Sequence, residues 1–284
     1  MKFIKYIALL IFPALFYIVA CTKQDYHLPD MPDKSTINME VKQDLTVDPG
    51  GNTIYLINHT DQIEPLWDFG TGKSSRQTDT IHFAFTGDYI IKRSAVTGGG
   101  LVYLDSVLVH VTKDNLNYVN DPFWNMLSGG PGQEKTWVLD MTAQAFDGPL
   151  FFYGTDNGWG GACTKPGGDC WNWNPKYADN KWLLPDGDYG TMTFSLKGGP
   201  FVKVTHAMIP ERGTENGTYY LDVNTKKLTI SGATPLHDAS RDGCVGAWGN
   251  IKLLSLTENA MQFAVLRTSC DGPCLLVYNY VKKP

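Results

Sequence analysis

The chain has 284 residues, with 24 lysines and arginines against 29 aspartates and glutamates, and a formal net charge of −5. Nucleic-acid binding depends on Lys and Arg side chains that neutralise phosphates, so this mildly acidic composition argues against a nucleic-acid partner. Glycine, proline and aromatic residues are plentiful, and charged residues are modest in number. Together with many short alternating segments, this composition favours an all-β protein of two domains.

Residues 1–20 have the pattern of a secretory signal. Two lysines precede an apolar run without acidic residues, and the run is too short and wrongly flanked for a stable membrane span. It ends in Ile-Val-Ala-Cys at residues 18–21, which resembles a bacterial lipobox. The resemblance implies cleavage before Cys21 and lipidation of Cys21, whose acyl chains would form a firm anchor. Residues 21–35 contain little apolar side chain, and we expect them to form a flexible tether.

Residues 36–113 alternate between apolar and polar side chains in short runs. The runs are at 38–42, 52–57, 80–85, 89–92 and 104–111. They are bounded by Asp-Pro-Gly-Gly, Gly-Thr-Gly and Gly-Gly-Gly, which are turn sequences. Period-2 patterning between turns predicts a small antiparallel β-sandwich.

The same segment resembles the PKD family of Ig-like domains. The sequence Trp-Asp-Phe-Gly-Thr-Gly at 67–72 is similar to that family's W-x-F-G-D-G turn, with Thr71 where the family usually has Asp. Phe83, Gly87 and Tyr89 fit the later F-x-x-x-G-x-Y strand. The resemblance implies that Trp67 and Tyr89 are core residues and that the domain is a spacer.

Residues 116–284 form the second predicted domain. After a start at 135–140, strands are predicted at 150–153, 191–196, 201–206, 217–222, 227–230, 251–255, 260–267 and 274–281. Two of these runs are predicted to form a hairpin around Asn224 and Thr225. About nine strands and no helical pattern predict a larger β-sandwich, or a jelly-roll-like arrangement.

Several pieces of this second domain resemble surface glycan-binding lipoproteins of starch-utilisation-like (Sus-like) systems. They are Leu-Ser-Gly-Gly at 127–130, Lys-Thr-Trp-Val-Leu-Asp at 135–140, the 218–230 hairpin, and Ile-Lys-Leu-Leu-Ser-Leu-Thr-Glu at 251–258. The resemblance implies an outer-membrane lipoprotein that faces the cell exterior. Such a protein captures polysaccharide without catalysis and works beside a TonB-dependent importer. PKD-like or Ig-like spacers are common in these proteins.

A long irregular segment, residues 154–182, holds four of the eight tryptophans. Gly and Pro break both helical and strand periods in it, and irregular segments this long are usually functional or disordered. Disordered segments are poor in aromatics, so we predict a folded loop that presents indole faces beside polar side chains. This combination suits a sugar, although tryptophans that merely cover the edge of a sandwich would give the same sequence.

The candidate sugar-binding residues come from this loop and from one later turn. The favoured aromatic platforms are Trp159, Trp171 and Trp173, followed by Trp182 and then by Trp248, while the candidate hydroxyl partners are Asp156, Asn157, Asn172 and Asn174.

Five cysteines follow Cys21. Cys163 and Cys170 are close enough in sequence to staple the long loop, and Cys270 and Cys274 flank a turn and could clip a hairpin. Cys244 is then unpaired, or one of those two pairs is wrong. A zinc site is the rival interpretation, but the spacings lack CxxC pairs.

The sequence does not favour an enzyme. A glycosidase needs two carboxyl groups about 5–9.5 Å apart, and the only glutamates after residue 116 are Glu134, Glu211, Glu215 and Glu258. Of these, Glu211 and Glu215 flank a turn and are expected to be solvated charges. His206 and His237 have no assignable catalytic partner and are expected to be structural or exposed. A lipid-anchored jelly-roll glycoside hydrolase is the alternative, and an adhesion or assembly protein is a third.

No cofactor is expected, although a structural calcium ion is possible. Its candidate ligands are hard oxygen donors near glycines, namely Asp156, Asn157, Asp179, Asp186 and Asp188.

Overall fold

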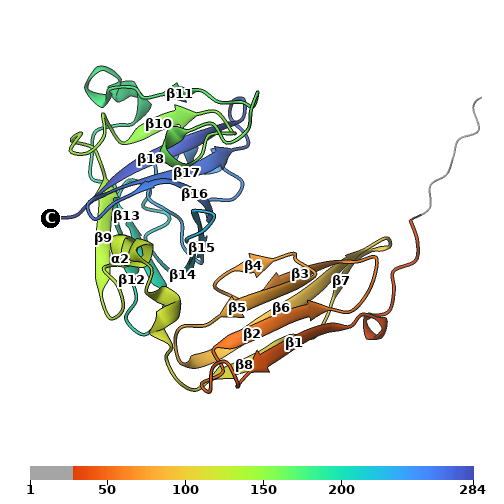
Figure 1. Cartoon of the computed structure of the whole chain (residues 1–284). Coiled ribbons are helices and arrows are strands. Elements are labelled where there is room, and N and C mark those ends of the chain that lie inside the picture. Colours follow the sequence, from red (N-terminus) through yellow and green to blue (C-terminus); the bar gives the residue numbers. More distant parts are fainter. Residues whose placement is uncertain (1–27) are drawn as a thin grey trace, which may run out of the picture.

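The computed structural model describes residues 28–284, so the predicted signal peptide, Cys21 and most of the tether lie outside the described residues. The all-β prediction is confirmed. Figure 1 shows two β-rich parts that open away from each other like the arms of a V. Between residues 28 and 284, no helix has the length and apolar character needed to cross a membrane.

The first part contains two antiparallel sheets behind a short 3-10 helix, η1 (Lys34–Thr36). One sheet has the order β1 (Met39–Asp44), β2 (Thr53–Asn58), β5 (Thr78–His82). The other has the order β4 (Lys73–Ser74), β3 (Glu64–Asp68), β6 (Gly87–Thr97), β7 (Gly100–Tyr103), and β8 (Val107–Val111) also pairs with β6. The apolar residues that alternate along these strands form one buried cluster.

Trp67 and Tyr89 occupy the positions expected of core residues. Trp67 is 1% exposed, and its indole N–H donates to the carbonyl of Arg76 at 3.1 Å. The half-buried Tyr89 stacks on Phe83 with ring centroids 3.7 Å apart and donates to the carbonyl of Phe85. Both side chains therefore pack in the core of the first part, as the resemblance to the PKD family implies.

The second part begins with η2 (Leu116–Val119) and a short α-helix of about two turns, α2 (Pro122–Ser128). Asp121 caps the helix by accepting from the backbone N–H of Phe123 at 2.9 Å, and Pro122 occupies its first turn. The helix buries Trp124 and Leu127. The expectation of no helix is wrong here, because seven residues are too few to display a helical period.

Eight antiparallel strands of the second part form a closed ring. They are β9 (Glu134–Leu139), β12 (Gly190–Ser195), β13 (Phe201–His206), β14 (Thr214–Asp222), β15 (Lys227–Ser231), β16 (Asn250–Leu256), β17 (Ala260–Arg267) and β18 (Cys274–Lys282). Each strand from β12 to β18 pairs with the next along the chain, and β18 returns to pair with β9. The strand order is thus a closed meander rather than the jelly-roll-like order expected, and it encloses the larger buried cluster. The predicted hairpin is confirmed as β14–β15.

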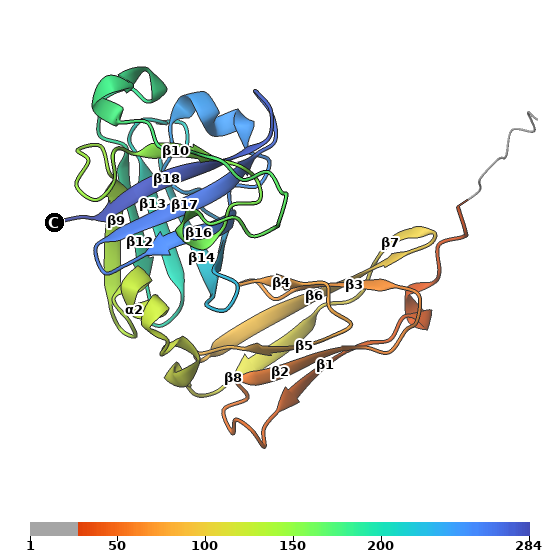
Figure 2. The same ribbon diagram turned by 45° about the horizontal axis from the view of Figure 1, so that its top comes forward.

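Two further strands extend the sheet beyond the ring. β10 (Leu150–Tyr153) pairs with β18 through Leu150↔Tyr278 to Tyr153↔Leu275, and β11 (Asn172–Trp173) pairs with β10. Phe152 contributes to the main buried cluster, whereas Phe151 and Tyr153 belong to a second cluster on the other side of the sheet. β10 is therefore held by apolar contacts on both faces, and the long loop starts from this fixed strand, as the turned view in Figure 2 shows.

The disulfides correct one predicted pair. Cys163 and Cys170 are bonded as expected, but Cys270 is bonded to Cys244, so the predicted Cys270–Cys274 clip is wrong. Cys274 is a free, buried thiol. It points from the first position of β18 into the main cluster, whereas Cys270 lies in the preceding turn beside η6 (Ala239–Cys244).

Peptide mapping by mass spectrometry should recover the 163–170 and 244–270 pairs from the oxidised protein. Burial raises the pKa of the Cys274 thiol, so it should resist alkylation in the native state and react once the chain is unfolded. Rapid alkylation of Cys274 in the native protein, or recovery of a 270–274 pair, would contradict this assignment.

Candidate functional site

The loop between β10 and β11, residues 154–171, is folded by its own backbone. Gly154 N–H donates to the carbonyl of Trp171 at 2.8 Å, and Asp156 N–H donates to the carbonyl of Asp169 at 3.0 Å. The disulfide between Cys163 and Cys170 closes the outer end of the loop. The loop is therefore ordered by a ladder and a staple, as the prediction of a folded segment requires.

Three of the predicted hydroxyl partners serve this loop internally. Asp156 accepts from the backbone N–H of Asp169 at 2.8 Å. Asn157 is 2% exposed and donates to the carbonyl of Gly161 and to the side chain of Asn172, both at 2.7 Å. These side chains are thus committed to loop structure, while Asn174 is exposed.

Trp171, Trp173 and Trp182 form what we call the tryptophan platform. Trp173 on β11 stacks on Phe152 with centroids 5.1 Å apart, and Trp182 in η5 (Lys181–Leu183) lies 6.4 Å from Trp173 at an interplanar angle of 32°. Trp171 directly precedes β11, and its indole N–H donates to the carboxylate of Asp169 at 2.9 Å. The exposed fractions of Trp171, Trp173 and Trp182 are 43%, 44% and 72%, which leaves indole surface open to a ligand.

Neighbouring loops fix the platform from beneath. Arg241 lies over the ring of Phe152, with its guanidinium carbon 5.6 Å from the ring centroid, and it donates to the carbonyl of Leu183 and to Asp238. Tyr177 of η4 (Tyr177–Asp179) donates to Asp186 at 2.8 Å, and burial with that carboxylate raises the pKa of Tyr177. Sequence reasoning missed Phe152 and Arg241, because neither residue carries a local motif.

Trp159 belongs to a different place on the surface. It lies in η3 (Trp159–Gly161), packs edge-on against Phe123 of α2 at 5.4 Å, and is 41% exposed. The ammonium of Lys226 sits 3.9 Å above Phe123 and 5.6 Å from the Trp159 ring. Trp159 is therefore separated from the platform by packing on α2, although the sequence places them in one loop.

Trp248 is a packing residue. Its exposed fraction is 9%, it stacks on His237 with centroids 3.8 Å apart, and its indole N–H donates to the carbonyl of Asp242 at 2.9 Å. Its ring faces are covered, so Trp248 is not a suitable sugar platform and that prediction is corrected.

The acidic and histidine candidates lie in a structural polar cluster. Glu215 accepts from Arg212 at 2.9 Å and from the backbone N–H of Thr234, and His206 lies 3.3 Å away. Partial burial raises the pKa of Glu215, but the bonds from Thr234 and Arg212 outweigh it and hold that pKa below its usual range. A general acid needs the opposite shift, so this arrangement supports structure rather than proton donation.

The other members of this cluster, His237 and Asp242, also bond within the protein. His237 is 1% exposed and lies 2.7 Å from both the carbonyl of Pro235 and the carboxylate of Asp242. Asp242 also accepts two bonds from Arg212. The cluster therefore fixes the segment 232–249 across the end of the ring, and Glu211 remains an exposed turn residue.

The candidate calcium ligands are dispersed. Asp186 accepts from Tyr177 and Lys181, and Asp188 accepts from the backbone N–H of Gly190 at 2.8 Å. Within residues 28–284, no group of three or more His, Cys, Asp and Glu side chains is arranged to hold a metal ion.

A comparison with protein-family profiles found no match, and a comparison with curated proteins found no significant relative.

The polar cluster predicts how stability depends on pH. Hydrogen bonds and Arg212 hold the pKa values of Glu215 and Asp242 below their ordinary values of 4.5 and 3.8, despite the raising effect of burial. Their ionised forms thus stabilise the fold above about pH 4.5, and this contribution is lost as the pH falls through the folded pKa values. Urea titrations should show that Glu215→Gln lowers the free energy of unfolding at pH 7 and flattens its decline below pH 4.5. Glu211→Gln should match the wild type, and equal behaviour of the two variants would refute the proposed role of the cluster.

Proposed function

We propose that this protein is a non-catalytic lipoprotein of the cell surface that binds polysaccharide through the tryptophan platform. The observation that carries the proposal is the pair of exposed indoles of Trp173 and Trp182, whose ring centroids lie 6.4 Å apart, with the exposed Trp171 at the end of the stapled loop that leads into β11. A sugar ring has an apolar C–H face and a polar rim, so it stacks on an indole and hydrogen-bonds sideways.

The resemblance to Sus-like surface proteins supports the cellular setting of this proposal. Acylation of Cys21 would hold the protein in the outer membrane, facing the exterior, and the captured glycan would pass to a TonB-dependent importer. The glycosidase alternative is disfavoured by the commitments of Glu215, which bonds to Arg212 and Thr234 rather than facing the platform. Residues 36–113 would then carry the binding part away from the membrane.

The platform predicts a specific pattern of affinity loss. One sugar face covers roughly 40–100 Å² of an indole, which at about 25 cal/mol per Å² is roughly 1–2.5 kcal/mol. Trp182→Ala and Trp173→Ala should each weaken binding about 5- to 70-fold. Affinity gel electrophoresis against a panel of purified soluble polysaccharides would measure this loss.

Two matched tryptophans serve as controls for this prediction. Trp159→Ala should leave affinity unchanged, because that ring packs on α2 away from the platform. Trp248→Ala should lower the free energy of unfolding by about 3–5 kcal/mol, as removal of a buried indole does. If Trp173→Ala and Trp182→Ala lose stability but retain affinity, the platform is packing and the sugar site lies elsewhere.

The anchoring prediction concerns Cys21. Cys21→Ala should abolish lipidation, because the acyl chains supply the membrane affinity, and the protein should remain uncleaved or be released. Cell fractionation with detection of the acylated species checks this. Persistence of a lipidated, membrane-bound variant would show that the anchor is attached elsewhere.

A further inference from the structure

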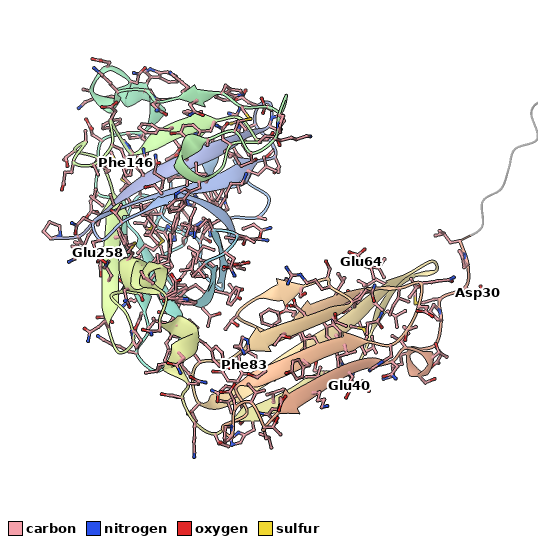
Figure 3. All side chains as sticks on the ribbon, viewed as in Figure 1. Asp30, Glu40, Glu64, Phe83, Phe146 and Glu258 are labelled. Atoms are coloured by element: carbon pink, nitrogen blue, oxygen red, sulfur yellow. A yellow bond between two sulfur atoms is a disulfide. The ribbon has the colours of Figure 1, made fainter. Side chains whose placement is uncertain are left out.

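The V between the two parts contains a groove that none of the preceding functions uses. It encloses about 660 Å³, which is in the range of about 300–1,000 Å³ typical of ligand sites. Its floor is the outer face of β14 to β18, Thr155 and Pro273 border it, and Lys73 of β4 closes it from the first part. In Figure 3 the side of the first part that carries Glu64 faces the closed ring of the second part, while the side with Glu40 faces away.

Contacts between the parts hold the wall of this groove in place. Tyr220 of β14 meets Phe69 edge-on with centroids 6.3 Å apart, and the hydroxyl of Thr218 lies 3.5 Å from the carbonyl of Gly70. Phe69 and Gly70 belong to the turn that leads into β4. Lys73 is thereby positioned by a docked turn.

Strand register determines which side chains face the groove. Tyr220, Thr229 and Asn250 are successive cross-strand partners, as are Lys227, Lys252 and Ala264, and Leu266 lies opposite Leu275. Their chain neighbours, such as Tyr219, Leu228 and Ile251, are buried in the main cluster. Alternation therefore places hydroxyl, amide and ammonium groups beside a floor of Tyr220 and leucine side chains.

The floor of the groove carries positive charge, although the chain as a whole is acidic. Lys227 and Lys252 lie directly opposite each other, and neither forms a salt bridge with another described residue. Like charges in this position are destabilising. Asp222 is the direct cross-strand partner of Lys227 and also lines the groove, where it accepts from the backbone N–H groups of Asn224 and Thr225. The floor therefore carries two ammonium groups against one carboxylate.

One of the two ammonium groups is also positioned. Lys252 Nζ donates to the carbonyl of Asn157 at 2.8 Å and lies 3.4 Å from that of Thr155, both at the start of the loop that ends in the platform. An ammonium has three donors, so one N–H of Lys252 remains for a ligand. Lys73, the third lysine, lies 3.7 Å from Asp68, so the net positive charge of the groove is the one that Lys227 and Lys252 have in excess of Asp222.

We propose that this groove binds an acidic sugar unit, whose carboxylate or sulfate is held between Lys227 and Lys252. Thr229 and Asn250 hydrogen-bond its hydroxyl groups, and its apolar face rests on Tyr220 and Leu266. This inference rests on the proposed polysaccharide-binding function and narrows the ligand class to anionic glycans. It also gives the first part a role in ligand binding, because Lys73 belongs to the same site.

Isothermal titration calorimetry on the full chain tests the inference with three probes: oligogalacturonate for carboxylates, carrageenan oligosaccharides for sulfates, and cello-oligosaccharides as the neutral arm. Lys227→Gln should weaken binding of the preferred acidic probe about 10- to 150-fold, as loss of a charge-assisted bond does. The Lys227 ammonium makes no hydrogen bond to another described residue, so folding should be unaffected. Lys203→Gln, an exposed lysine on β13 outside the groove, is the matched control.

The outcomes separate this inference from the platform proposal. Absence of binding to both acidic probes, or binding that is the same for Lys227→Gln and the wild type, overturns the groove. If Lys227→Gln loses the acidic probe while Trp182→Ala retains every probe, the groove stands and the platform fails. Binding of the neutral probe alone, abolished by Trp182→Ala, leaves the platform and overturns the groove. Preference between the two acidic probes identifies the anionic group.

Discussion

The forked pairing of β18 is the constraint on which the second part of the molecule depends. The C-terminal half of this strand pairs with β9 and closes the ring, while its N-terminal half pairs with β10 on the same edge. If β18 paired only with β9 along this edge, β10 would have no strand to pair with, and β11 pairs only with β10. Because the edge divides, the sheet continues outward as a short flap with apolar contacts on both faces, and this flap supports the tryptophans.

The junction between the two parts is also a packed structure. Ala84 and Phe85 from the first part belong to the main buried cluster of the second, and Figure 3 labels their neighbour Phe83 near this junction. Tyr118 stacks on His82 with centroids 4.0 Å apart, and it bonds to Asp48. Shared side chains at this position hold the arms of the V at a set angle, which a groove between them requires.

Much of the fold could be predicted from local sequence, because strands of alternating residues between turns carry their own signal. The strands at 150–153, 201–206 and 260–267 have the predicted bounds, and Trp67 is buried as the resemblance of residues 67–72 to the PKD turn implies. Closure of the ring could not be predicted, since pairing of β18 with β9 joins residues far apart in the sequence. The Cys244–Cys270 bond could not be predicted for the same reason, because only the fold brings η6 beside the turn before β18.

In the candidate site, too, local sequence predicted some features and long-range packing determined the others. Composition identified the loop and its tryptophans, but not which indoles remain open: Trp182 is 72% exposed and Trp248 is 9% exposed. Both lie in Gly-rich or polar surroundings, so their difference arises from tertiary packing alone. Phe152 and Arg241 support the platform from a strand and a distant loop, and no local pattern connects them.

The Cys163–Cys170 disulfide affects when the loop at residues 154–171 loses its conformational entropy. A flexible loop of this length would lose conformational freedom when ligand arrives, and that loss would weaken the complex. Here the backbone ladder and the disulfide remove part of that freedom before any ligand binds. Reduction of this bond would therefore restore conformational freedom to residues 163–170 while leaving the apolar cluster inside the ring unchanged, so the redox state of two thiols sets the order of this part of the surface independently of the fold.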